Sequence, residues 1–186
     1  MSCTRRSLLL LSAAAGLSAA GAGSAQAASA REIARDAERA LRRLYAEDSK
    51  ARMLGGRARA ILVFPRIIKA GLIIGGQSGN GALLVRGRPT AYYNISAASF
   101  GLQIGGQAFS YALFFITESS LEYLRNSDGW AIGSGPSVVV VDKGAAASLT
   151  STTLTQDVYA FPFGQRGLMA GIGLEGSKIT RIHPGP

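Results

Sequence analysis

The sequence predicts an α+β fold in which N-terminal amphipathic helices pack on a strongly curved, mostly antiparallel sheet or small barrel with glycine-bent strands. Residues 31–46 repeat apolar side chains at helical spacing, whereas the chain beyond residue 70 alternates them as strands do. A glycine-rich segment at 71–77 also returns at 101–107 and, more loosely, at 167–173. Because glycine inside a strand marks a bend, a bulge or a close backbone approach, these copies predict strong curvature.

The three copies place leucine and isoleucine on one strand face and mostly glycine on the other. None of them contains an ionisable side chain, so they indicate a scaffold rather than a reactive site. The glycines to which we assign this structural role are Gly71, Gly75, Gly101, Gly105, Gly167 and Gly171.

The N-terminal helices are predicted from one apolar stripe and from capping signals. In the helix expected at 31–46, Ile33, Leu41 and Leu44 share the stripe, and the arginines lie largely elsewhere. Ser49 is placed to cap a short second helix, which the glycine pair that follows would end.

The strands are predicted from alternation and from the turn residues between them. The apolar run at 60–64 reads as a buried strand that Pro65 stops. Further strands are expected at 71–78, 81–87, 91–99, 101–115, 136–142, 148–155, 157–163, 167–174 and 177–183. Turns, or in the first case a single helical turn, are expected at 65–70, 79–81 and 86–89, and a helix at 118–126.

Residues 1–27 are expected to be a signal peptide. Arg5-Arg6 precede a short apolar run, and Ala25-Gln26-Ala27 offers a cleavage site. The arginine pair also resembles a twin-arginine signal, so both export routes stay open. The remainder, 28–186, is expected to be one domain with a helical region at about 31–56 and a sheet-rich region at about 59–183. It contains no cysteine, which excludes disulfides and cysteine-based metal sites there.

Positive charge is concentrated near the start of this domain. Residues 31–69 contain 11 basic and 5 acidic side chains, whereas residues 70–186 contain 7 and 6. Such asymmetry indicates an acidic partner, which for an exported protein is a membrane surface or anionic polymer rather than nucleic acid. Two interpretations of the first helix stay open: it lies on an anionic membrane, or its stripe docks on the glycine face of the sheet and leaves the arginines in solvent. The docked interpretation is favoured, and it still presents the arginines outward.

Groups for catalysis or metal binding are sparse. The single histidine, His183, lies in a Pro/Gly tail that is expected to be loose, and one histidine without cysteine does not build the common zinc sites. The glycine pattern at 171–176 lacks the helix that a dinucleotide site requires. The sequence therefore predicts no enzyme, no catalytic residues, no metal and no cofactor.

Several short motifs, in this order, resemble the SYLF (Ysc84-like) lipid-binding domain in its bacterial exported form. The similarity covers roughly residues 35–183. The motifs that carry it are Asp48-Ser49-Lys50-Ala51-Arg52, Ala60-Ile61-Leu62-Val63-Phe64-Pro65, Lys69-Ala70-Gly71, Gly75-Gly76, Ser99-Phe100 with the 101–107 copy, Gly167-Leu168 and Leu174-Glu175-Gly176-Ser177.

The resemblance implies phospholipid binding, to which an N-terminal amphipathic helix and basic residues contribute in eukaryotic members. Carried onto this chain, the implied lipid-binding residues are Arg35, Arg39, Arg42, Arg43, Lys50, Arg52, Arg66 and Lys69. We expect a non-enzymatic protein of the bacterial envelope, in the periplasm, that binds anionic phospholipid at the membrane periphery. The alternatives are a structural or protein-interaction module, with an envelope partner or as a homo-oligomer, and a carrier of a lipid or small apolar ligand inside the barrel.

Overall fold

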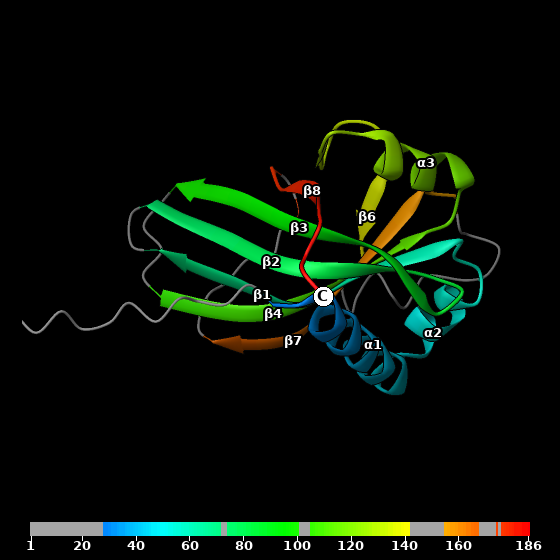
Figure 1. Cartoon of the computed structure of the whole chain (residues 1–186), viewed down its shortest axis with the longest axis horizontal. Helices are drawn as coiled ribbons and strands as arrows, with labels where there is room; N and C mark the ends of the chain where they lie inside the picture. The colour runs from blue at the N-terminus through cyan, green and yellow to red at the C-terminus, as the bar shows by residue number, and fades with distance from the viewer. Residues whose placement is uncertain (1–27, 72–73, 101–104, 142–154, 168–173, 175) are drawn as a thin grey trace, which may run out of the picture.

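The computed structural model describes residues 28–71, 74–100, 105–141, 155–167, 174 and 176–186 (Figure 1). The helices are α1 (Ala30–Glu47), α2 (Ser49–Gly55) and α3 (Glu118–Asn126). The strands are β1 (Ala60–Gly71), β2 (Ile74–Val85), β3 (Arg88–Phe100), β4 (Gly105–Phe115), β5 (Trp130–Ala131), β6 (Val138–Val140), β7 (Val158–Gly167) and β8 (Lys178–Ile182). The expected signal peptide and the strand expected at 148–155 lie outside the described residues, apart from residue 155.

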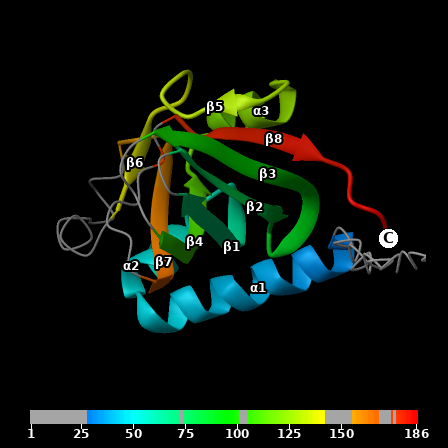
Figure 2. The same ribbon diagram turned by 90° about the vertical axis from the view of Figure 1, so that its left-hand side faces the viewer.

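The strands form one sheet that curls into a half-barrel, which confirms the predicted α+β class. Their order is β5-β8-β3-β2-β1-β4-β7-β6, and the described pairs are antiparallel apart from β6 with β7. Figure 2 shows α1 along one side of the curl, with α3 and β5 on the other. The sheet therefore has helices against both of its faces.

Each face of the sheet carries its own apolar cluster. Ile61 and Val63 of β1 pack with α1 and α2, whereas Leu62 and Phe64 belong to the cluster that contains α3. The alternation of a strand sends neighbours to opposite faces, so a strand buried on both sides is apolar throughout. This explains the continuous apolar run at the start of β1.

Helix α1 docks on the sheet through the predicted stripe. Ile33, Leu41 and Leu44 are buried against one face of the sheet. The docking prediction is therefore confirmed, but the expected glycine surface is wrong. The sheet side of this cluster is aliphatic and aromatic: Ile61, Val63, Ala82, Leu84, Ala112, Phe114, Tyr159, Phe161 and Phe163.

The caps of the N-terminal helices come from polar side chains. Ser29 and Glu32 form a reciprocal capping box at the start of α1. The cap of α2 is Asp48, not the expected Ser49, because the Asp48 carboxylate accepts from the amides of Lys50 and Ala51 at 2.8 and 3.0 Å. At the other end of the chain, the carbonyl of Gly185 accepts from the Ala30 amide at 2.9 Å, so the tail is tied to α1 rather than loose.

The predicted stop at Pro65 is wrong, because β1 continues through it. The ladders of β1 with both neighbours are irregular around this point, between Phe64 and Ile67 on the β4 side. A bulge of this kind tolerates proline in a central strand, since the ladder is already interrupted there. The turn or helical turn expected at 65–70 is therefore a bulged strand.

The turn expected at 79–81 is also wrong, because these residues lie inside β2. A Cβ on Gly79 would sit 2.5 Å from the carbonyl oxygen of Arg66, and one on Gly81 would sit 2.5 Å from that of Val63. Glycine is required at both positions because the β1 backbone passes too close for any side chain. These glycines accommodate the neighbouring bulge.

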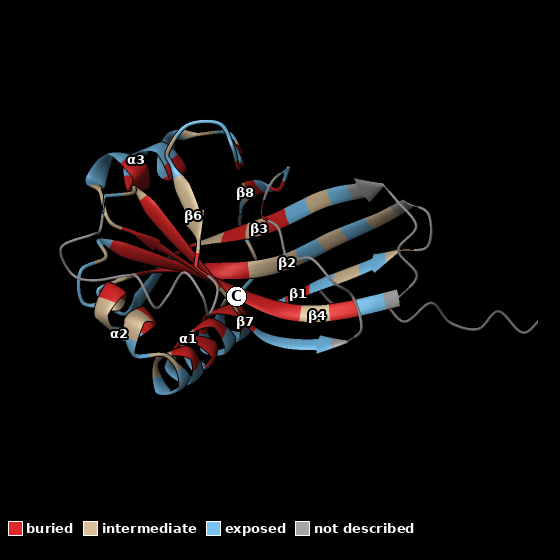
Figure 3. Cartoon of the chain, turned by 180° about the vertical axis from the view of Figure 1, so that it is seen from behind, coloured by how far each residue is buried: buried red, intermediate tan, exposed pale blue. Residues whose placement is uncertain are grey.

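The described residues of the glycine copies lie at one end of the sheet. The first copy spans a hairpin rather than one strand, since Gly71 of β1 pairs with Gly75 of β2 and also with Gly105 of β4. Gly101 and Gly171 are outside the described residues, and Gly167 is the last residue of β7. At this end the strands extend beyond the helices, and their surface is mostly intermediate or exposed (Figure 3).

Helix α3 and the β2–β3 turn match the prediction in kind, whereas the strand expected at 167–174 lies outside the described residues apart from 167 and 174. Helix α3 begins after Thr117, whose hydroxyl accepts from the Ser120 amide, and it ends at Asn126 as expected. The turn expected at 86–89 joins β2 to β3 with positive φ at Arg86 and Gly87. The two-residue strand β5 was not predicted.

Candidate functional site

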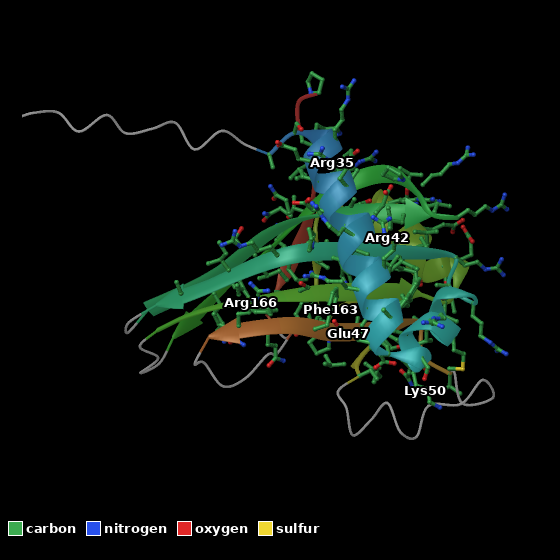
Figure 4. The ribbon with its side chains drawn as sticks, turned by 90° about the horizontal axis from the view of Figure 1, so that it is seen from below. Arg35, Arg42, Glu47, Lys50, Phe163 and Arg166 are labelled. Atoms are coloured by element: carbon green, nitrogen blue, oxygen red, sulfur yellow. The ribbon has the colours of Figure 1, made fainter. Side chains whose placement is uncertain are left out.

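The outward side of α1 carries four of the predicted site residues. Arg35, Arg39, Arg42 and Arg43 are all exposed, because the apolar stripe of the helix is taken up by the sheet. Figure 4 shows α1 lying across the strands, with Arg35 in its first half and Arg42 further along it. A membrane contact made by this face is therefore polar, since the apolar stripe is already buried.

Local acids moderate the charge of α1. The helix contains five arginines and four acidic residues. Arg39 forms an ion pair with Asp36, and Nη1 of Arg42 lies 3.9 Å from Oε2 of Glu38. Such exposed pairs contribute only about 0–1 kcal/mol each, so they do not immobilise the arginines. In contrast, Arg35 and Arg43 take part in no ion pair among the described residues.

The predicted residues of α2 lie close to its start and end. Arg52 is exposed and donates from Nε to the carbonyl oxygen of Tyr45 at 3.1 Å, which ties α2 to the last turn of α1. A cation there also complements the carbonyl end of the α1 dipole. Lys50 is only partly exposed. Arg52 therefore has a structural role in addition to any contact with a ligand.

Burial around the same junction affects Tyr45. Its ring lies where a side chain on Gly55 would be, with the hydroxyl oxygen 2.0 Å from the position of an added Cβ. Loss of hydration on burial disfavours the phenolate and raises the pKa of Tyr45 to about 12. Gly55 is required because the α1–α2 corner is closed by this ring.

Two of the predicted lipid-binding residues line a hollow together with an arginine that was not predicted. A hollow of about 330 Å³ lies at the flank of α1 and is lined by Arg43 of α1, Arg66 of β1 and Arg166 of β7. We name it the three-arginine hollow. Arg166 lies on the sheet to one side of α1, further along β7 than Phe163 (Figure 4). Lys69, the last predicted residue, is half-buried in β1 and is not among the lining residues.

The backbone under the three-arginine hollow is irregular. The β1 bulge forms one side, and the β4–β7 ladder shifts between Ala108 and Ser110. The Ser110 hydroxyl, 3% exposed, donates to the carbonyl oxygen of Pro65 at 2.8 Å and so joins the two irregularities. Gly164 adopts a φ of 64°, which favours glycine. Bulges often redirect side chains at functional sites.

A second basic hollow, of about 500 Å³, lies near the β2–β3 turn and α3. Four arginines line it, together with one acid: Arg57, Arg59, Arg86, Arg125 and Glu118. The sequence prediction missed this grouping because three separate segments supply the arginines. The carboxylate makes this hollow less selective for an anion than the three-arginine hollow, whose described lining residues include no acid.

The acidic residues and the histidine that the structure describes do not gather into a metal-binding group. No group of three His, Cys, Asp or Glu residues among the described residues is placed to hold a metal. His183 is exposed in the tail. The carboxylate of Asp157 accepts from the backbone amide of Ser137, from its hydroxyl and from the hydroxyl of Thr117, and these bonds lower the pKa of the carboxyl. These bonds connect three segments and explain Asp157 as a structural residue.

Comparison with known proteins gives one family. A family model described as Ysc84, Las17-binding protein actin regulator, matches residues 96–183. This span is shorter than the similarity expected from the sequence and includes Arg166, whereas all eight predicted lipid-binding residues precede it. No curated protein matches the chain. Through residues 96–183, this chain belongs to the Ysc84 (SYLF) domain family.

Proposed function

We propose that this chain is an exported, non-enzymatic protein that binds anionic phospholipid at the periphery of a membrane, through the exposed arginines of α1. The observation that carries the proposal is the orientation of α1: its apolar stripe is buried in the sheet, and Arg35, Arg39, Arg42 and Arg43 face outward. Its family comprises actin- and lipid-binding domains, which is consistent with membrane association. Among the described residues, no helix is long and apolar enough to span a bilayer.

The charges favour a reversible association. A basic side chain near an anionic membrane contributes about 1 kcal/mol, and the contribution decays over a Debye length of roughly 8 Å at physiological salt. With Arg39 and Arg42 partly neutralised by nearby acids, the four arginines supply on the order of 2–4 kcal/mol together. This is enough for salt-sensitive binding and too little for permanent anchoring. Periplasmic localisation is part of the proposal and rests on the expected signal peptide.

The test is vesicle co-sedimentation of a charge-reversal variant with a matched control. Arg35→Glu/Arg42→Glu changes two exposed arginines of α1, and Arg88→Glu/Arg181→Glu makes the same change in net charge at exposed positions of β3 and β8. We expect the first variant to lose most binding to anionic vesicles and the control to retain most of it. Equal losses would show that only the net charge matters and would contradict a role for α1.

The behaviour of the wild-type chain separates membrane binding from binding to a protein partner. If the wild-type chain sediments with neither neutral nor anionic vesicles, the membrane proposal fails. A protein partner or self-association then becomes the explanation of the exposed arginine face. All four substituted side chains are exposed, so we expect each variant to fold normally. Circular dichroism of each variant checks this.

A further inference from the structure

The three arginines of the hollow are exposed, but their origin differs from that of arginines along one helix face. Its three arginines come from three elements far apart in the sequence: Arg43 from α1, Arg66 from β1 and Arg166 from β7. An amphipathic helix accounts for outward arginines on one element only. It does not explain why two strands under that helix direct arginines to the same place.

Among the described residues, no acid compensates the charge in this hollow. None of the three arginines forms an ion pair among the described residues, and the lining contains no acid. By contrast, Arg39 and Arg42 elsewhere on α1 each have a nearby acid. Like charges around one hollow repel one another, so an anion between them removes an unfavourable interaction as well as forming new ones.

The backbone that carries two of these arginines is fixed by specific contacts. Arg66 leaves the chain within the β1 bulge, next to the bond from Ser110 to the Pro65 carbonyl. Gly79 of β2 leaves space for the carbonyl of Arg66. Arg166 follows the positive φ of Gly164 on β7. A site on strands connected in this way is less mobile than one on loops, which favours specific recognition.

The arrangement of donors indicates the chemistry of the anion. A guanidinium presents a planar fork of N–H donors that matches the oxygens of phosphate, so three guanidiniums together can engage several oxygens. A phosphate monoester offers three terminal oxygens and a charge of about −2, whereas a diester offers two and a charge of −1. The hollow is about ten times the volume of one water, at roughly 30 Å³ for water. It therefore has room for a small group attached to the phosphate.

We propose that the three-arginine hollow binds a phosphate monoester, carried either by a lipid headgroup or by a small soluble molecule. This inference deepens the proposed function and rests on it only for the lipid as the source of the phosphate. The outward arginines of α1 would attract any anionic surface, and the hollow would select monoester phosphate on it. Ser110 is not a ligand in this proposal, because its proton is already donated to Pro65.

The first arm of the test uses soluble ligand and the full chain. Glycerol 3-phosphate is titrated into the wild-type protein, into Arg66→Gln/Arg166→Gln and into the control Arg88→Gln/Arg181→Gln, with calorimetry as the readout. Hydrogen bonds to charged groups are strong enough that we expect a loss of roughly tenfold or more per arginine, and no loss in the control. Equal binding in all three proteins would overturn the proposal, and absence of binding in the wild type would exclude the soluble source and leave the phosphatidate comparison below to decide.

A conservative variant tests the recognition geometry. Arg66→Lys/Arg166→Lys keeps both charges and removes both forks. We expect its affinity for glycerol 3-phosphate to lie between those of the wild type and the glutamine variant, because charge remains without bidentate bonding. Full wild-type affinity in the lysine variant would overturn the assignment of forked monoester recognition.

The second arm identifies the source of the phosphate with vesicles. Vesicles containing phosphatidate, a monoester, are compared with phosphatidylglycerol vesicles, a diester, at matched surface charge. A preference for phosphatidate that Arg66→Gln/Arg166→Gln abolishes supports a lipid source; binding of glycerol 3-phosphate without such a preference supports a soluble one. If anionic vesicles bind but neither monoester is recognised, the hollow proposal fails while the proposed function stands. If glycerol 3-phosphate binds and no vesicle does, the proposed function fails while the hollow proposal stands with a soluble ligand.

Discussion

The contact between β1 and β2 at the bulge gives the sharpest prediction about the fold. Gly79→Ala would place a Cβ 2.5 Å from the carbonyl oxygen of Arg66, and 2.9 and 3.0 Å from Cγ1 and Cα of Ile67. The closest of these atoms is backbone, so the bulge itself must shift. Overpacking of this kind costs typically 1–3 kcal/mol. Apart from such contacts, replacing glycine by alanine in a strand raises the free energy of unfolding by roughly 0.5–1 kcal/mol. The expected net loss is therefore about 0–2.5 kcal/mol, with a midpoint of roughly 1 kcal/mol.

The matched control is Gly76→Ala in the same strand. Its Cβ would meet the nearest atom, the carbonyl oxygen of Ala97, at an ordinary 3.6 Å. We therefore expect Gly76→Ala to be neutral or slightly stabilising. The assay is the free energy of unfolding in urea, supported by thermal melting, where 1 kcal/mol corresponds to about 2–4 °C for a chain of this size. If Gly79→Ala is as stable as Gly76→Ala, the close approach of β1 described above is incorrect.

Three further predictions concern the packing of α1 and two titrating groups. Leu44→Ala removes a side chain that is 3% exposed between α1 and the sheet, so it should lower the free energy of unfolding by about 2–5 kcal/mol; a loss below 1 kcal/mol would mean that α1 is not docked in solution. The folded-state pKa of Asp157 lies below its unfolded value, so its contribution is present above the unfolded pKa and lost as pH falls through the folded one; urea unfolding should show less acid sensitivity in Asp157→Asn than in wild type. The pKa of Tyr45 is raised to about 12, so stability should fall as pH rises from about 10 toward that value, and Tyr45→Phe should reduce this fall.

The N-terminal helices could be predicted because their signals are local. The stripe of Ile33, Leu41 and Leu44 repeats at helical spacing, and polar residues stand at the helix starts. Even so, the cap of α2 was placed one residue late, since Asp48 and Ser49 are both good caps and only the backbone decides between them.

The course of β1 and β2 could not be predicted, because the decisive contacts are between strands. Pro65 and the 79–81 segment both have the composition of turns. In the structure the proline lies at a bulge, and the glycines of β2 make room for that bulge. The turn-like composition of each segment therefore results from contact with another strand, which the sequence alone does not show.

The candidate site was predicted in part for the same reason. The arginines of α1 are visible in the sequence because they alternate with its apolar stripe. Arg166 stands alone in its segment, and only the pairing of β7 with β4 brings it to Arg43 and Arg66. The unusual φ of Gly164 is likewise invisible until the backbone is known.

Electrostatic attraction to anionic lipid by a docked α1 is the central claim, and vesicle co-sedimentation of the wild-type chain tests it most directly. Neutral and anionic vesicles are compared at low and high salt. We predict binding to anionic vesicles only, with a marked loss at high salt, because the arginines face outward and the apolar stripe is buried. Equal, salt-independent binding to neutral vesicles would contradict the account, since it would require apolar insertion of a helix that the structure shows packed against the sheet.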